Sequence, residues 1–406
     1  MFIEQKSTQR YFSAIIGHIL KYYDKSIYGF LIPFLAPLFF PHADPVYSLL
    51  AGYALLPLGI LAKPLGAYVF GRLGDRWGRK FCLFITLLGM GCTTGAIGCL
   101  PTFEEAGWIG PFLLTLGRLL QNFFAAGESS GGALFLLEHT EEKKRGLMSS
   151  LFDASGILGI FLAALAATLA GEAHWRWLFW LGGLASLPGL FIRHSSEEIF
   201  TPPKKQTTWK RRDWAAFFAV AAVSGFSYAN YYLLSTFLNG FLPLVSQVTA
   251  QEALVLNTLL LGVDFLLLPL FGWLSLHVKK EIFIFTSLFL GACMALPLFL
   301  LLDGANLWIA GGVRITLTVI GVCLAAPYHA WAMETAPQER RFMVCAMGAA
   351  LGDRLIGASA PAAGLWLYHQ TGWIASPSIL LIGSALLAGG SLLHLKWQIA
   401  RQSELG

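Results

Sequence analysis

Hydrophobic residues occur along the chain in long blocks that are separated by short clusters of polar residues. Each block is close to the roughly 20 residues that a helix needs to cross the apolar core of a bilayer. A backbone that faces lipid has to satisfy its own hydrogen bonds, so the blocks predict helices, whereas a β-barrel would show short alternating strands. We therefore predict an all-α integral membrane protein with twelve transmembrane helices. The blocks lie at approximately 12–39, 47–71, 80–100, 109–137, 147–170, 175–193, 213–240, 252–276, 282–302, 306–333, 342–368 and 374–396.

The composition supports this interpretation. Of the 406 residues, 56% are hydrophobic and 13% are charged, whereas roughly a quarter of the residues in an average soluble protein are charged. This scarcity of charge excludes a cytosolic enzyme, a nucleic-acid binder and a disordered scaffold. The six cysteines lie in apolar blocks without metal-binding spacing, so we expect no metal and no cofactor. The first block contains Lys21, Asp24 and Lys25, which argues against a cleavable signal peptide.

The basic residues predict an orientation in the membrane. Of the 28 Lys and Arg, 21 lie in the terminal segments and in alternate loops, while the loops on the opposite side contain none. By the positive-inside rule, both termini are then cytoplasmic. We place the chain in the inner membrane of a bacterial cell. The other seven lie within or at the edge of a block: Lys21, Lys25, Lys63, Arg118, Arg176, Arg314 and Arg354.

The longest polar segment divides the chain in half. It runs from Ser195 to Asp213, is rich in Pro and Lys, and has six hydrophobic blocks on each side. We predict an N-terminal six-helix bundle at 1–194, a cytoplasmic linker at 195–212 and a C-terminal six-helix bundle at 213–406. Such repeated halves are typical of transporters with a central binding cavity.

The loop between the second and third blocks carries a specific motif. Residues 71–80 read GRLGDRWGRK, which resembles the G-x-L-x-D-R-x-G-R-K signature of the major facilitator superfamily. A solvated loop that only sets the topology is the alternative. The glycines permit close helix approach and a tight turn. The resemblance implies a fold of two six-helix bundles and a cytoplasmic gate, to which we assign Gly71, Gly74, Asp75, Arg76, Gly78, Arg79 and Asp153.

Further segments resemble the metabolite:proton symporter branch of that superfamily, over roughly residues 17–200. They are YYDKSIYG and FFP in the first block, KPLGAYVFG in the second, and RLLQNFFAAGESSGGA in the fourth. The resemblance implies proton-coupled import of organic acids or betaines. It also implies a proton-coupling role for the glutamate Glu128, with a structural ion pair as the alternative.

Charged residues deep in a membrane are expensive and therefore candidates for function. Asp24 lies about 12 residues into the first block, roughly 18 Å deep at 1.5 Å per residue. Arg118 lies at a similar depth in the fourth block. We predict that these two and Glu128 carry proton coupling, while a fixed ion pair is the alternative. For Asp153 we predict a salt bridge to arginines of the 71–80 motif.

The remaining deep charges point to an anionic substrate. The deep cations outnumber the deep acids, and arginine suits carboxylate recognition. The alternative is that these charges neutralise one another across helices. Aromatic residues of the seventh block recur at helical spacing, which fits either an organic ligand or an interfacial belt. The predicted substrate-binding residues are Lys21, Tyr28, Arg118, Tyr228, Tyr231, Tyr232, Asp264, Arg314 and Arg354.

These observations predict a monomeric proton-coupled symporter that works by alternating access. Its predicted substrate is a small organic anion, a di- or tricarboxylate such as citrate. Import of a carboxylate siderophore, import of an amino acid or betaine zwitterion, and efflux by antiport are the alternatives. We find no GxSxG, HxxxxD or metal cluster, so we expect no enzyme and no catalytic residues. The expected partners are the substrate, protons and the lipid bilayer, without nucleic acid.

Overall fold

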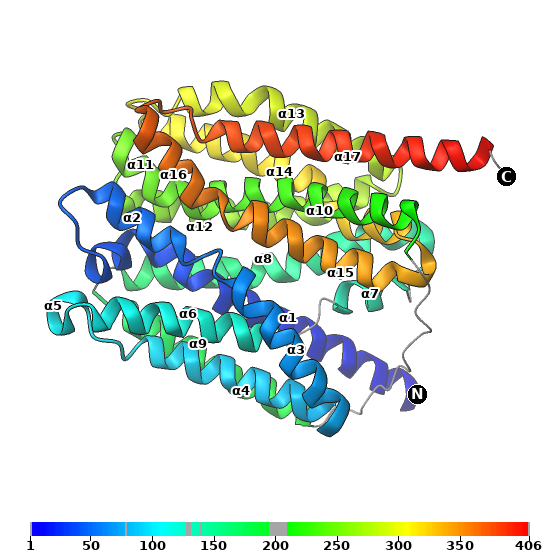
Figure 1. Ribbon diagram of the computed structural model, residues 1–406, viewed down its shortest axis with the longest axis horizontal. Coiled ribbons are helices and arrows are strands. Elements are labelled where there is room, and N and C mark those ends of the chain that lie inside the picture. The colour runs from blue at the N-terminus through cyan, green and yellow to red at the C-terminus, as the bar shows by residue number, and fades with distance from the viewer. Residues whose placement is uncertain are drawn as a thin grey trace. The chain divides into compact units, whose positions relative to one another are not determined.

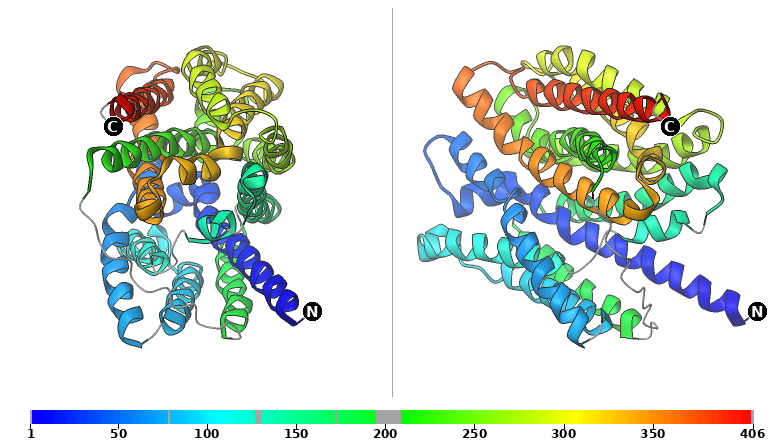
Figure 2. Two further views of the ribbon diagram at one scale, coloured as in Figure 1. Left: turned by 90° about the vertical axis from the view of Figure 1, so that its right-hand side faces the viewer. Right: turned by 45° about the vertical axis from the view of Figure 1, so that its right-hand side comes forward.

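The computed structural model describes residues 2–77, 79–126, 131–138, 140–171, 173–194 and 209–404, and every regular element there is a helix (Figures 1 and 2). The N-terminal half contains α1 (Phe2–Phe39), α2 (Pro45–Ala54), α3 (Gly59–Trp77), α4 (Arg79–Ile97), α5 (Phe103–Ala106), α6 (Ile109–Ala125), α7 (Gly131–Glu138), η1 (Glu142–Lys144), α8 (Arg145–Ala170) and α9 (Trp175–His194). The C-terminal half contains α10 (Arg211–Tyr232), η2 (Leu233–Phe237), α11 (Leu238–Val245), α12 (Ala250–Leu274), α13 (Lys280–Leu300), α14 (Leu307–Thr335), η3 (Gln338–Arg340), α15 (Arg341–Gly352), η4 (Asp353–Gly357), α16 (Ala360–Thr371) and α17 (Ser378–Glu404).

Each predicted hydrophobic block corresponds to one helix or to helices in series. The second block forms α2 and α3, and the fourth forms α6 and α7. The seventh and eleventh blocks each consist of two α-helical parts joined by a short π-helix. Within the described residues, eight helical segments are long and apolar enough to cross a membrane by length and composition. The all-helical membrane fold is thus confirmed.

Contacts within the chain group it into two compact units. Unit 1 contains residues 1–129 and 155–204, and unit 2 contains residues 130–154 and 205–406. Residues 130–154, which include the start of α8, thus group with the second unit. The linear division of the chain into bundles at 1–194 and 213–406 stays a prediction.

Small residues allow the helices of each unit to pack closely. In unit 1, a Cβ at Gly159 of α8 would collide with the carbonyl oxygen of Ile19 on α1. In unit 2, a Cβ at Gly352 would collide with backbone atoms of Ala221 and Gly225 on α10. Close helix approach through small residues is typical of membrane bundles. Accordingly α10, which packs against α14, α15 and α17, is mostly buried at the centre of unit 2 (Figure 2).

The two π-helices both lie in unit 2. The first, η2, interrupts the seventh block at Leu233–Phe237, and the second, η4, interrupts the eleventh at Asp353–Gly357. A π-helix contains an extra residue per turn and occurs mostly at functional positions in longer α-helices. Each of these two elements contacts or contains one of the deep charged residues, as the next section describes.

Candidate functional site

A chain of hydrogen bonds in unit 1 links Asp24 to Arg118. The hydroxyl of Thr94 donates to Oδ1 of Asp24 at 2.6 Å. The side-chain amide of Gln121 donates to Thr94 at 2.7 Å, and Arg118 donates to Oε1 of Gln121 at 2.8 Å. The four residues come from three helices, α1, α4 and α6. We call these four residues the unit 1 relay, because they connect a titratable acid to a permanent cation.

Arg118 is held in place by further contacts. It is buried, with 6% of its surface exposed, and its guanidinium stacks on the ring of Tyr28 at 4.2 Å. The Tyr28 hydroxyl in turn donates to the carbonyl oxygen of Gly52 at 2.9 Å. Stacking on an aromatic face suits a planar guanidinium. Tyr28, which we predicted as a substrate contact, therefore supports Arg118, and its buried position argues against direct contact with a substrate.

The prediction of an Asp24–Arg118 pair thus has a specific geometry. The structure joins the two residues through Thr94 and Gln121, two neutral side chains that the sequence analysis did not select. A carboxylate only accepts hydrogen bonds and a guanidinium only donates them, so the relay has one direction, from Arg118 to Asp24. The third predicted coupling residue, Glu128, and the side chain of Lys21 lie outside the described residues.

Arg314 of α14 is fully buried in unit 2. Its guanidinium donates to the backbone carbonyls of Ala253 at 2.9 Å and Leu234 at 2.9 Å. It also donates to the side-chain oxygens of Asn239 at 3.0 Å and Asn257 at 2.6 Å. These acceptors come from η2, α11 and α12, and all are neutral. Arg314 therefore ties three helical segments together rather than presenting its charge to a ligand, which corrects its predicted role as a carboxylate contact.

Arg354 also has a partner within unit 2. Its Nε lies 3.3 Å from Oδ2 of Asp353, and both residues belong to the π-helix η4 and are buried. The pair fits the alternative that the deep charges neutralise one another. Fewer deep cations are therefore available to a ligand, because Arg314 and Arg354 are both engaged by the protein itself.

A second group of titratable residues gathers in unit 2. Nε2 of His329 on α14 lies 3.0 Å from Oδ1 of Asp153 on α8, and the backbone N–H of His329 donates to the hydroxyl of Ser149. Asp264 on α12 is also buried in this unit. Among the described residues of unit 2, Asp264 forms no ion pair. Its predicted role as a substrate-binding residue stays a prediction.

Asp153 has a partner that was not predicted. The structure pairs it with the imidazole of His329. Asp153 lies two turns into α8, where α8 contacts α14 through Ser149 and His329. This contact brings the imidazole of His329 next to Asp153. The side chain of Arg79 lies outside the described residues, so the salt bridge that we expected between Asp153 and arginines of the 71–80 motif stays a prediction.

The predicted aromatic contacts of the seventh block lie on α10. Tyr232 is buried, Tyr228 and Tyr231 are partly buried, and the rings of Tyr231 and Tyr232 meet edge to face at 6.3 Å. Tyr228 packs against Gly357, where a Cβ would collide with it, at the end of η4. The burial of these rings argues against an exposed interfacial belt. Whether they contact a substrate stays a prediction.

The gate motif is helical over most of its length. Gly71, Gly74, Asp75 and Arg76 belong to the last turns of α3, and Arg79 begins α4. The two glycines thus do not form the tight turn that we predicted. Arg76 is exposed, whereas Gly78 and the side chains of Asp75 and Arg79 lie outside the described residues. The gating role of these residues stays a prediction.

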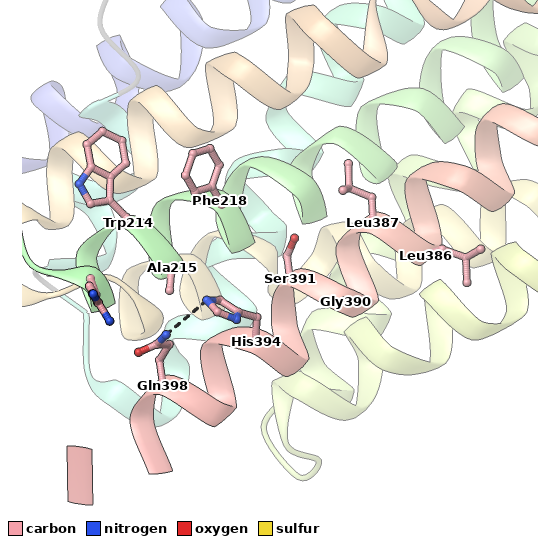
Figure 3. Close-up of a pocket in the computed structure, with 10 residues that line it drawn as sticks. Trp214, Ala215, Phe218, Leu386, Leu387, Gly390, Ser391, His394 and Gln398 are labelled. Atoms are coloured by element: carbon pink, nitrogen blue, oxygen red, sulfur yellow. Dashed lines mark hydrogen bonds between the residues drawn. The ribbon is translucent and has the colours of Figure 1, made fainter. Parts of the chain in front are cut away.

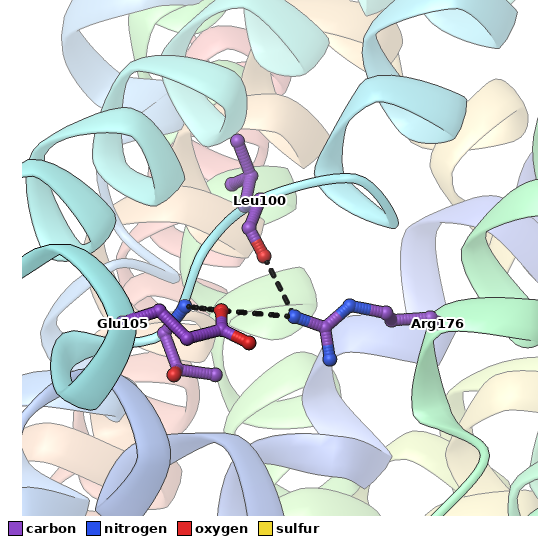
Figure 4. A network of polar contacts seen from close by, with 4 residues as sticks. Leu100, Glu105 and Arg176 are labelled. Carbon is purple, nitrogen blue, oxygen red and sulfur yellow. Dashed lines mark hydrogen bonds and ion pairs between the residues drawn. The ribbon is translucent and has the colours of Figure 1, made fainter.

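A polar network fastens the loop between α4 and α6 to the start of α9 (Figure 4). Arg176 donates to the carbonyl oxygen of Leu100 at 3.0 Å and lies 3.4 Å from Oε2 of Glu105. The backbone N–H of Thr102 donates to the same carboxylate oxygen at 2.7 Å. This backbone hydrogen bond, aided by Arg176, holds the pKa of Glu105 below its usual range. Arg176 therefore acts as a structural cation at the edge of unit 1.

The described residues contain no group of three or more His, Cys, Asp or Glu side chains that could hold a metal ion. What they do contain is a helical membrane bundle with buried charges on several helices. Such residues mark substrate and proton pathways in transport proteins. The fold and the buried charges therefore define a multi-pass membrane protein of the transporter class.

Comparison with known proteins identifies the family. The sequence profile of the Major Facilitator Superfamily matches residues 14–352, so the chain belongs to this superfamily and is a transporter, not an enzyme. The fold agrees, because a crystal structure of a D-xylose-proton symporter superposes with a TM-score of 0.70 at 12% identity. That superposition covers 94% of this chain and 97% of the other. The resemblance that we inferred from the 71–80 motif is thus confirmed.

Relatives in bacteria are named as transporters of small organic solutes. The glycine betaine/proline/ectoine/pipecolic acid transporter of Dickeya dadantii is 30% identical over 345 residues, covering 77% of this chain and 68% of the relative. The proline/betaine transporter of Escherichia coli is 26% identical over 407 residues, covering 92% and 80%. The shikimate transporter of Escherichia coli is 27% identical over 408 residues, covering 94% and 92%.

Proposed function

We propose that the chain is a proton-coupled symporter that imports a small organic zwitterion of the amino acid or betaine class. The observation that carries the proposal is the unit 1 relay, in which Thr94 and Gln121 connect Asp24 to Arg118. Asp24 is the proton carrier and Arg118 the fixed positive charge. The name of the structurally similar D-xylose-proton symporter is consistent with this assignment, although the sequence identity is low.

The relay gives protonation a structural consequence. Arg118 remains charged at every physiological pH, so the charge of the relay changes only when Asp24 gains or loses its proton. In the ionised state, Asp24 accepts the hydrogen bond of Thr94 and fixes the orientation of Thr94 and Gln121. Protonation weakens that hydrogen bond and leaves Arg118 without its distant counter-charge. A proton that binds one conformation more tightly than another shifts the population between them, as symport requires.

The contacts of the deep cations support a substrate with a single carboxylate. Recognition of a di- or tricarboxylate needs two or more cations that face the ligand. Arg314 donates to four neutral acceptors, and Arg354 pairs with Asp353. Both were predicted to bind carboxylates, and the structure engages both elsewhere. Citrate and carboxylate siderophores are therefore less favoured substrates than the zwitterion that we predicted as an alternative.

The names of the relatives favour the same substrate class. They include betaine, proline, ectoine and shikimate, each of which carries one carboxyl group. A quaternary ammonium is recognised by aromatic faces. Tyr228, Tyr231 and Tyr232 of α10 are the residues that we propose for this role. We also propose that both termini lie in the cytoplasm, because the basic residues gather at that end of the helices.

The proposal can be tested by transport into proteoliposomes that contain the purified protein. An inward proton gradient is imposed with the membrane potential clamped, and uptake of labelled proline, glycine betaine, shikimate and citrate is compared. We expect accumulation of proline or glycine betaine above equilibrium, and little of citrate. Accumulation of citrate alone would contradict the substrate class while leaving proton coupling intact.

The coupling role of Asp24 requires its own variant. With Asp24→Asn, we expect no gradient-driven accumulation, whereas exchange of labelled for unlabelled solute persists. Asp303→Asn is the matched control, because Asp303 is an exposed acid in the loop between α13 and α14. Accumulation by Asp24→Asn equal to that of the control variant would refute the coupling role of the relay.

A further inference from the structure

A groove with a volume of about 630 Å³ lies on unit 2, between the first turns of α10 and the middle of α17 (Figure 3). Trp214 and Phe218 of α10 form one side, while Leu386 and Leu387 of α17 form the other. The four side chains are between 47% and 66% exposed, so the groove opens to the surroundings of the helices. None of the lining residues belongs to the unit 1 relay or to the buried charged residues of unit 2.

The polarity of the groove changes along its length. Leu386 and Leu387 lie at one end in Figure 3, while His394 and Gln398 lie at the other. Gln398 and His394 are within 3.5 Å of each other, and Arg211 lines the same groove from the first turn of α10. Gln398 lies twelve residues after Leu386, which corresponds to about 18 Å of helix at 1.5 Å per residue. A ligand that fits has a polar, negatively charged end and a long apolar part.

Contacts within the protein hold the α10 side of the groove in place without a ligand. Asp213, next to the groove residue Trp214, lies 3.4 Å from Nε of Arg340. The guanidinium of Arg340 stacks on Trp209 at 4.9 Å, and the Trp209 ring lies 4.5 Å from that of Trp214. These contacts fix the start of α10 to the segment that precedes α15. A rigid wall reduces the ordering that binding requires.

The charges around the polar end select the sign of the ligand. Lys210 and Arg212 flank Arg211, and Lys396 and Arg401 lie near the end of α17. The distribution of basic residues predicts that this end of the helices faces the cytoplasm, where the membrane surface is negatively charged. Trp214 is exposed near the polar end, as expected for an indole at the boundary between lipid and water.

We propose that this groove binds an anionic phospholipid of the cytoplasmic leaflet. The phosphate of the headgroup contacts Arg211 and the polar edge formed by His394 and Gln398, and one acyl chain lies along Phe218, Leu386 and Leu387. Arginine binds phosphate oxygens through two parallel N–H groups, which suits it to a lipid phosphate. Of the basic residues around the polar end, Arg211 alone lines the groove, so we assign the phosphate contact to it.

Gly390 allows the apolar part of the groove to be filled without damage to the fold. It lies on α17 among the lining residues, and a Cβ built on it would meet no atom within 4 Å. A leucine there occupies space that the acyl chain needs. The adjacent Gly389 has equally open surroundings but does not line the groove, so Gly389→Leu is a matched control.

The test is native mass spectrometry of the full-length purified protein after removal of lipid, with titration of phosphatidylglycerol and, separately, phosphatidylcholine. We expect tighter binding of phosphatidylglycerol. Since one basic residue near the surface contributes about 1 kcal/mol, Arg211→Gln should weaken this binding about fivefold. Gly390→Leu should weaken it to a similar extent, whereas Arg212→Gln and Gly389→Leu leave it within about twofold of the unchanged protein.

Three results would overturn the proposal. Equal loss in Arg211→Gln and Arg212→Gln would mean diffuse attraction rather than a site. Unchanged binding in Gly390→Leu would exclude an acyl chain in the groove. Displacement of the lipid by free glycerol phosphate at similar concentration would mean that the groove binds a soluble phosphate. A thermal unfolding profile of each variant confirms that the proteins compared are folded.

Discussion

Two arginines in corresponding helices have opposite surroundings. Arg118 lies in the fourth hydrophobic block of the N-terminal half, and Arg314 lies in the fourth of the C-terminal half. Both are buried. Arg118 reaches a carboxylate through Thr94 and Gln121, whereas Arg314 donates only to neutral carbonyl and amide oxygens. The first arginine thus belongs to a network whose charge changes with pH, and the second belongs to a network whose charge is constant.

This difference separates a coupling residue from a structural one. A buried cation needs hydrogen-bond acceptors in the protein, and the guanidinium of each arginine donates to at least one of them. What distinguishes them is the presence of a titratable group at the far end of the network. Depth in the membrane and residue type, which are visible in the sequence, are the same for both. The role of a deep arginine is therefore decided by its acceptors.

The largest expected effect is the loss of stability in Arg314→Met. The substitution removes the donor that Arg314 supplies to the carbonyls of Ala253 and Leu234 and to the side-chain oxygens of Asn239 and Asn257. Such losses cost about 3–5 kcal/mol. We expect a decrease of this size in the free energy of unfolding, measured in mixtures of detergent and SDS. A decrease below about 1 kcal/mol would contradict the structural role of Arg314.

The second largest expected effect is a loss of proton-driven transport in Arg118→Met. This change removes the permanent charge of the relay, so protonation of Asp24 no longer shifts the conformational equilibrium. Coupling free energies of this kind correspond to roughly 5–150-fold in an equilibrium constant. We expect proton-driven accumulation to fall within that range, while stability decreases less than in Arg314→Met. The reverse order of effects would show that the assignment of roles to the two arginines is wrong.

A smaller effect is expected for Thr94→Val, which keeps the shape of the side chain and removes its hydroxyl. Thr94 both donates to Asp24 and accepts from Gln121, so the relay is interrupted in the middle. One hydrogen bond to a charged group contributes about 1.5–3 kcal/mol. We expect the pH profile of uptake to move to higher pH, because the ionised form of Asp24 loses a donor.

The adjacent threonine supplies the control for this experiment. Thr93 donates only to the carbonyls of Gly89 and Met90 in its own helix. Thr93→Val should leave the pH profile of uptake unchanged. A profile that moves equally in both variants would mean that the shift arises from general changes in α4 and that the relay has no part in it.

The smallest effect concerns the network around Glu105 in unit 1. The backbone N–H of Thr102 and the guanidinium of Arg176 lower the pKa of Glu105, so the carboxylate stabilises the folded state above its ordinary pKa. This contribution is lost as the pH falls through the lowered pKa of the folded state. The difference in Tm between the unchanged protein and Glu105→Gln should therefore shrink between pH 7 and pH 3. A difference that is constant over this range would contradict the assignment.

The sequence predicted the helices because hydrophobic blocks of spanning length leave few other structures. The position of Asp24 and Arg118 deep in their blocks also followed from counting residues. Thr94 and Gln121 were missed, because neutral polar side chains are common in helices and carry no signal on their own. Gln121 lies three residues after Arg118, so their proximity on one helix face was available, but the contact with α4 requires the packing of the unit.

The contacts of Arg314 could not be predicted from the sequence for a different reason. Its partners include backbone carbonyls, which every residue possesses, and two asparagines from separate helices. Likewise, the partner of Asp153 depends on which residues of α14 lie next to it when the two helices pack. Sequence spacing sets which residues share a helix face, but it does not set which neighbouring helix that face meets.

The π-helix η2 shifts the rotational phase of the seventh span. Nine residues separate Asn230 from Asn239, and a continuous α-helix would place them about 180° apart on its circumference. The extra residue in η2 reduces this angle to about 80°. Both asparagines accordingly contact α14, Asn230 through the carbonyl of Leu317 and Asn239 through Arg314. Deletion of one residue within Leu233–Phe237 would place the two asparagines eight residues apart, again about 80° from each other in a continuous α-helix, so Asn239 would keep its orientation toward Arg314 without the π-helix.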